Sequence, residues 1–157
     1  MTESAQSFIT PLTLQALSKN PVHSDVMEEK LAERINHIDL AKKTDLFIVA
    51  PASANTIAKL AHGMADNMLT ATALALPSTT PKLIAPAMNT KMYENPLTKK
   101  NLKILQEVGY QEILPKSGLL ACGDTGRGAL ADISVIIESI DTVSYTHLRA
   151  HETSLHL

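Results

Sequence analysis

The chain has 157 residues, enough for one ordinary domain, and its 45% hydrophobic and 19% charged residues are typical of a globular protein. It has no Trp, two Phe, three Tyr and a formal net charge of −2, so we expect neither base-stacking platforms nor a basic surface for nucleic acid. No apolar run approaches the length of a membrane span, and we expect no membrane partner. One Cys and the lack of a signal-peptide pattern predict a reducing, cytoplasmic environment.

The first residues favour helices rather than a strand. Ser4 can cap a first helix, and Pro11, after Thr10, occupies the tolerated first position of a second helix. A doubly wound domain normally opens with a strand that leads into its first ligand-binding loop. We therefore expect either a variant of this fold or a chain that lacks its opening strand, loop and helix, about 30 residues.

From residue 45 onward, buried-strand patterns alternate with helical patterns. The runs DLFIVAP and KLIAP are short, apolar and end in Pro, as strands buried on both faces do. We expect strands at 45–51, 82–86 and 112–114. We expect helices at 53–63, 66–76, 95–107 and 132–140, with a Gly-rich loop at 117–128. This alternation predicts βαβ units and an α/β fold, a doubly wound, Rossmann-like parallel sheet with helices on both faces and with its first strand missing.

Two neighbouring strands end alike, in APASAN (50–55) and APAMN (85–89). Ligands of open α/β sheets bind outside the carboxyl ends of the strands, so we expect Asn55 and Asn89 to line one crevice. Met88 belongs to the same crevice. The alternative is that Ser and Asn only cap the following helices; the recurrence of the pattern favours a site.

Cys122 lies in LLACGDTGRGAL, among three glycines. A buried structural Cys is the common case, but a Cys in a mobile loop beside a crevice can donate a proton or act as a nucleophile. The glycine spacing matches neither a Walker motif nor a dinucleotide fingerprint, and we interpret the loop as a flap.

Two further observations concern histidines. His37 precedes the first strand, where a surface or capping role is more common than catalysis. The end of the chain, 144–157, holds His147, His151 and His156. His147 and His151 could share a helical face and bind a metal, but we favour a flexible or non-native tail, expect no metal and leave this segment out of the function.

Four motifs together resemble the flavin-dependent cysteine decarboxylases. They are HIDLA (37–41), PASANTIAKLAHGMADN (51–67), APAMNTKMYENP (85–96) and LLACGDTGRGALAD (119–132). The resemblance extends from Met1 to about residue 140. It implies a flavoprotein domain over 1–143 that lacks its opening strand and phosphate loop, followed by the tail at 144–157.

The resemblance also implies a cofactor and a reaction. Family members bind FMN and oxidatively decarboxylate the cysteinyl end of their substrate. The branch that matches best acts on 4′-phospho-N-pantothenoylcysteine in coenzyme A biosynthesis and reduces the resulting enethiol to 4′-phosphopantetheine. The alternatives are a peptidyl-cysteine decarboxylase of peptide-antibiotic maturation and a non-catalytic flavin-fold regulatory or binding protein.

Roles for individual residues follow from the same resemblance. It implies catalytic roles for His37 in proton handling, Asn89 in holding the substrate and Cys122 in returning a proton. The implied FMN contacts are Thr2, Ser4, Ser53, Ala54, Asn55, Thr56 and Ala87. The implied substrate contacts are Met88, Asn89, Leu120 and Ala121. We also expect a homotrimer or a multiple of trimers, with flavin and histidine contributed across a subunit boundary, and a phosphopantothenate-cysteine ligase as a fused or separate partner.

Overall fold

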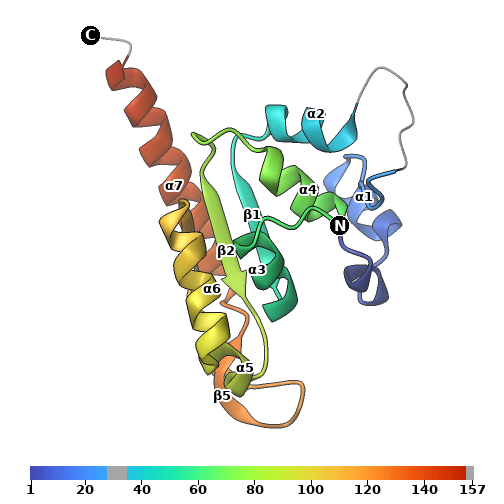
Figure 1. The fold of residues 1–157 in the computed structure, drawn as a ribbon, viewed down its shortest axis with the longest axis vertical. Coiled ribbons are helices and arrows are strands. Elements are labelled where there is room, and N and C mark those ends of the chain that lie inside the picture. The colour runs from blue at the N-terminus through green and yellow to red at the C-terminus, as the bar shows by residue number, and fades with distance from the viewer. Residues whose placement is uncertain (28–34, 155–157) are drawn as a thin grey trace. The chain divides into compact units, whose positions relative to one another are not determined.

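The computed structural model describes residues 1–27 and 35–154 and divides into two compact units (Figure 1). The first unit comprises Met1–Thr44 and His62–Ser78, and the second comprises Asp45–Ala61 and Thr79–Leu157. Among the described residues, no helix is long and apolar enough to cross a membrane.

The first unit is helical. Its elements are the 3-10 helix η1 (Ser4–Ser7), α1 (Pro11–Ser18), α2 (Asn36–Lys43) and α4 (Met68–Ala75), and α2 packs against α4. Thr10 caps α1 and Pro11 begins it, as predicted. Ser4 is not a cap, which corrects our expectation, because the amide of Ala5 donates to Oγ1 of Thr2 instead.

The second unit contains a parallel three-stranded sheet in the order β1-β2-β3. The strands are β1 (Phe47–Ala52), β2 (Lys82–Pro86) and β3 (Tyr110–Glu112). The predicted parallel α/β sheet is confirmed. The third strand begins earlier than predicted because Gly109, with φ of 94°, ends the preceding helix and turns the chain at once. Tyr110 then packs edge-on against Phe47, with ring centroids 6.5 Å apart.

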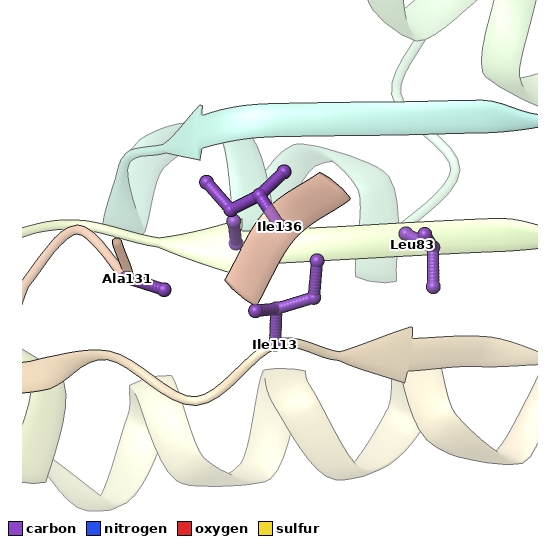
Figure 2. Packing of buried hydrophobic residues seen from close by; sticks show 5 residues of the cluster. Leu83, Ile113, Ala131 and Ile136 are labelled. Carbon is purple, nitrogen blue, oxygen red and sulfur yellow. The ribbon is translucent and has the colours of Figure 1, made fainter. Parts of the chain in front are cut away.

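Helices cover both faces of the sheet. Successive side chains of a strand point to opposite sides, so each face of β2 presents its own side chains to a helix. On one face, Leu83 and Ala85 of β2 join a buried cluster with Ile113, Ala131 and Ile136, the last from α7 (Ile133–Ser154), as Figure 2 shows. Ile84 of β2 points to the opposite face. There α3 (Ala54–Ala61) packs against α6 (Pro96–Glu107), and the buried residues of the two helices include Ile57 and Leu105.

Two local predictions were wrong, and one helix was not predicted. The segment expected to be a Gly-rich loop forms an antiparallel hairpin of β4 (Lys116–Leu119) and β5 (Thr125–Ala129). A short helix, α5 (Thr90–Glu94), was not expected. Helix α7 continues to Ser154 instead of ending near residue 140. Within it, hydroxyls of Thr142 and Thr146 donate to carbonyls one turn back, and Arg149 lies over the ring of Tyr145.

Candidate functional site

The carboxyl ends of β1 and β2 lie side by side, as the repeated strand-end motif predicted. Ala52 is in register with Pro86, and the amide of Ala87 donates to the carbonyl of Ala52 over 3.0 Å. The segments that follow, beginning at Ser53 and Ala87, therefore leave the sheet at one edge. Parallel strands place the start of both segments in the same region of the second unit.

Ser53 begins α3 as a capping residue. Its Oγ accepts a hydrogen bond of 3.2 Å from the amide of Thr56 and lies 3.3 Å from the Thr56 hydroxyl. The capping role that we weighed against a binding role is therefore present. Ser53 and Asn55 are nevertheless exposed, so polar groups at the start of α3 are open to a ligand.

Asn89 is held by its own helix cap. Its Oδ1 accepts a 2.9 Å hydrogen bond from the amide of Lys91 at the start of α5. This bond fixes which end of the side-chain amide carries the oxygen. The NH₂ end consequently points away from α5, and Nδ2 donates to Sγ of Cys122 over 3.3 Å. The structure thus brings together two of the three residues predicted to be catalytic, although they lie 33 positions apart.

The β4–β5 hairpin is docked on the segment that carries Asn89. The amide of Met88 donates to the carbonyl of Gly128 over 2.9 Å. Gly128 has φ of 153°, and a Cβ there would collide with the Met88 carbonyl oxygen. A Cβ at Gly126 would collide with the side chain of Thr90. We did not predict this docking. The signal was the spacing of Gly126 and Gly128, which puts both on one face of a strand.

Cys122 lies in the turn of this hairpin, with Leu120 and Ala121 before it. The turn is closed by two backbone hydrogen bonds, from Leu120 to the carbonyl of Asp124 (2.8 Å) and from Gly123 to the carbonyl of Leu120 (2.9 Å). Cys122 is exposed, and its thiol donates to Oδ2 of Asp124 over 3.5 Å. Asp124 was part of the quoted motif, but the sequence analysis gave it no role.

The remaining candidates, Thr2, Ser4 and His37, belong to the first unit. His37 lies in the first turn of α2. Its Nδ1 is buried and has no hydrogen-bond partner among the residues that the structure describes. A buried polar atom left unpaired is unfavourable, so such an atom in a native protein points to a ligand, a water or another chain.

The second unit brings together polar groups of several types near the carboxyl ends of β1 and β2. They are a neutral amide donor, a free thiol, and hydroxyls and backbone amides at the carboxyl edge of a parallel sheet. In the described ranges, no group of three His, Cys, Asp or Glu side chains is placed to hold a metal ion. An amide donor beside a thiol, at a sheet edge with exposed polar groups, is an arrangement that can hold an organic cofactor together with its substrate.

This chain belongs to the flavoprotein family, whose model matches residues 1–144. Within it, the chain is 63% identical to a probable phosphopantothenoylcysteine decarboxylase of Streptococcus mutans, over 90% of this chain and 79% of that protein. It is 51% identical to the coenzyme A biosynthesis bifunctional protein CoaBC of Bacillus subtilis, over 88% of this chain and 34% of that protein. The chain thus spans about a third of the bifunctional relative.

Solved structures agree with these relatives. A PPC decarboxylase mutant complexed with pantothenoylaminoethenethiol matches with a TM-score of 0.82 and 37% identity, over 90% of this chain and 79% of that chain. An FMN-dependent cysteine decarboxylase, SpaF, matches with a TM-score of 0.76 and 31% identity, over 96% of this chain and 77% of that chain. The predicted fold and the predicted resemblance to phosphopantothenoylcysteine decarboxylases are confirmed.

Proposed function

We propose that this chain decarboxylates 4′-phospho-N-pantothenoylcysteine and yields 4′-phosphopantetheine in an FMN-dependent reaction of coenzyme A biosynthesis. The observation that carries the proposal is the 3.3 Å contact between Nδ2 of Asn89 and Sγ of Cys122. It puts a group that can orient a carboxylate beside a group that can return a proton. The 63% identity to the Streptococcus mutans relative supports the same reaction.

The chemistry of the sheet edge fits FMN. Ser53 and Thr56 present hydroxyls at the start of α3, and Ala54 and Asn55 present backbone amides in its first turn. The amide of Ala87 donates to the carbonyl of Ala52, so we assign Ala87 to a flavin contact by resemblance alone. These donors and acceptors suit the polar edge of a flavin ring, and the positive end of the α3 dipole favours an anionic group. We assign Thr2 and Ser4 to the flavin phosphate by resemblance. When bound, FMN would supply the ability to accept and return a hydride.

We assign Asn89 to the substrate carboxylate. Its Oδ1 is occupied by the amide of Lys91, so its two N–H groups are the available donors. One N–H reaches Cys122, and the second can bind the carboxylate. A neutral amide suits this task better than Arg. A carboxylate that leaves as neutral carbon dioxide should not be stabilised in its charged ground state by a strong cation.

Cys122 returns a proton when the enethiol is reduced. In that step its S–H bond breaks and the sulfur keeps the electron pair, while the proton forms a C–H bond with the electron pair of the substrate C=C bond. The hydride for the other carbon would come from the reduced flavin. Met88, Leu120 and Ala121 flank Asn89 or Cys122 in the chain, and we assign them to substrate contacts. A hairpin that closes over the substrate would exclude water from this proton transfer.

His37 handles protons at the flavin. Its buried Nδ1 lacks a partner among the described residues, as expected for a nitrogen that meets a ligand or another subunit. We propose a homotrimer, or a multiple of trimers, in which the flavin and His37 come from neighbouring subunits. We also propose that the protein acts in the cytoplasm. A phosphopantothenate-cysteine ligase is the partner we expect, and the bifunctional relatives support a fused form.

The experiment is to measure carbon dioxide release from phosphopantothenoylcysteine and from a peptide ending in Cys, with FMN present. We expect release from phosphopantothenoylcysteine and phosphopantetheine as product. Release from the peptide alone would favour the peptide-antibiotic reaction. Binding of FMN without release from either substrate would favour a non-catalytic role.

The variant Cys122→Ser separates the two halves of the reaction. It should still release carbon dioxide, because decarboxylation does not use the thiol, but the product should remain at the oxidised or enethiol stage. An unchanged yield of phosphopantetheine would reject the role given to Cys122.

A further inference from the structure

We propose that Asp124 is a positioning residue that holds the thiol of Cys122 for its proton transfer. The inference rests on the proposed function, since it assumes that Cys122 returns a proton to the substrate. It adds a residue that acts through the thiol and does not itself touch the substrate. Asp124 lies two positions after Cys122 in the turn of the β4–β5 hairpin.

The sulfur of Cys122 is held by two partners of opposite type. The NH₂ group of Asn89 donates to the sulfur over 3.3 Å, and the thiol donates to Oδ2 of Asp124 over 3.5 Å. A thiol is both a weak acceptor and a weak donor, so this arrangement uses both of its capacities. One partner fixes where the sulfur lies, and the other fixes where its proton points.

The backbone determines the position of the Asp124 carboxylate. The carbonyl of Asp124 accepts from the amide of Leu120, and Gly123, with φ of 83°, supplies the left-handed residue of the turn. A side chain would be strained at that φ, whereas Gly adopts it freely. The turn therefore brings the carboxylate back toward the side chain two residues before it, independently of any ligand.

The base of the hairpin determines the position of the other partner. Contact of Gly126 with Thr90 and of Gly128 with Met88 leaves no room for the hairpin to slide over the segment that carries Asn89. Asn89 in turn is fixed by its bond to the amide of Lys91. The sulfur thus lies between two groups that are each held by backbone hydrogen bonds.

This arrangement has a chemical consequence. A thiol on an exposed turn can occupy several staggered rotamers, and only some of them direct its proton usefully. With Asp124 as acceptor, one rotamer of the side chain is favoured and the sulfur is in place before the substrate needs the proton. Rotation about the Cβ–Sγ bond then turns the S–H group from the carboxylate to the substrate carbon. During the transfer the proton passes from sulfur to the substrate carbon, and Asp124 neither gains nor loses a proton. Misplacing a reacting group by ~1 Å can cost on the order of 100-fold in rate, so the second half-reaction should depend on Asp124.

The test compares Asp124→Ala with Asp124→Asn in the FMN-loaded protein. We expect Asp124→Ala to release carbon dioxide within about twofold of the wild-type rate, while the yield of phosphopantetheine per carbon dioxide falls about tenfold or more. Asp124→Asn keeps an acceptor oxygen and should restore most of that yield. Asp132→Asn is the matched control, because it removes an acidic group that pairs with Lys116 at the base of the same hairpin but does not contact Cys122.

A second readout does not depend on activity. Cys122 is the single cysteine of the chain, so the S–H stretching band in a Raman spectrum reports this thiol alone. Asp124→Ala should raise the frequency of the band because the S–H group loses its acceptor, and Asp132→Asn should leave it unchanged. Suppose that Asp124→Ala leaves both the S–H band and the yield of phosphopantetheine unchanged, while Cys122→Ser loses that yield. This result would overturn the role of Asp124 and leave the role of Cys122 standing. An unchanged yield in Cys122→Ser would overturn the role of Cys122 and with it the role of Asp124, whereas wild-type protein that releases no carbon dioxide from phosphopantothenoylcysteine would overturn the proposed function itself.

Discussion

Gly128 lies directly against Met88: the Met88 amide donates to the Gly128 carbonyl over 2.9 Å, and a Cβ at Gly128 would collide with the Met88 carbonyl oxygen. This contact joins the hairpin that carries Cys122 to the segment that carries Asn89. The distance between the predicted catalytic thiol and amide is therefore set by a backbone contact that only glycine permits.

Replacing Gly128 by Ala should separate the hairpin from that segment. We expect a loss of about 1–3 kcal/mol in the free energy of unfolding, because the new Cβ meets a backbone atom and the φ of 153° is strained for Ala. Urea denaturation measures this loss, and the yield of phosphopantetheine should fall with it. Gly118→Ala is the control, since its Cβ would make only an ordinary contact with Ala129. Equal stability of the two variants would argue against the docking.

Asn89→Asp should separate capping from catalysis. Asp is as good a helix cap as Asn, so the stability of α5 should be retained to within about 0.5 kcal/mol. Carbon dioxide release should fall about 100-fold or more, because a carboxylate cannot donate to the substrate carboxylate and repels it. A stopped assay for carbon dioxide together with a thermal melt measures both effects. Turnover close to wild type would remove Asn89 from substrate binding.

His37→Asn should lose turnover, as expected if the imidazole handles protons at the flavin. His37→Leu tests the buried Nδ1 in addition. Because that nitrogen has no partner among the described residues, replacing the ring by an apolar side chain should cost less than about 1 kcal/mol or stabilise the chain. Denaturation and turnover are measured on the same preparations. A large loss of stability in His37→Leu would show that the imidazole is structurally required.

Tyr110 should make the stability fall at high pH. Burial raises the pKa of Tyr110 to about 12 in the folded protein, from a usual value of 10.0. The folded state therefore keeps the phenol proton more tightly than the unfolded state does. The stabilisation is fully present below pH 10 and is lost as the pH rises from about 10 to about 12. Urea denaturation at several pH values measures this slope, which should become shallower in Tyr110→Phe. An identical slope in both proteins would contradict the assignment.

Several elements could be predicted because their signals are local. KLIAP is β2 at the predicted residues, and Thr10 with Pro11 begins α1, since a run of apolar residues and a cap each act within a few positions. The β4–β5 hairpin could not be predicted in this way. Its strands contain Gly118, Gly126 and Gly128, and glycine by its own propensity disfavours a strand. Contact with Thr90 accounts for Gly126 and contact with Met88 accounts for Gly128, and neither contact is visible in the local pattern.

Local patterns in the sequence are sufficient for the fold class and for the resemblance that named His37, Asn89 and Cys122, and they predict the edge of the sheet at which a ligand would bind. Only the tertiary structure brought Asn89 within 3.3 Å of Cys122 and gave the thiol a second partner in Asp124. The physical reason is the range of the interactions. Periodicity and caps act over one or two turns of chain, whereas residues 33 positions apart meet only when the backbone of the hairpin packs on the segment after β2.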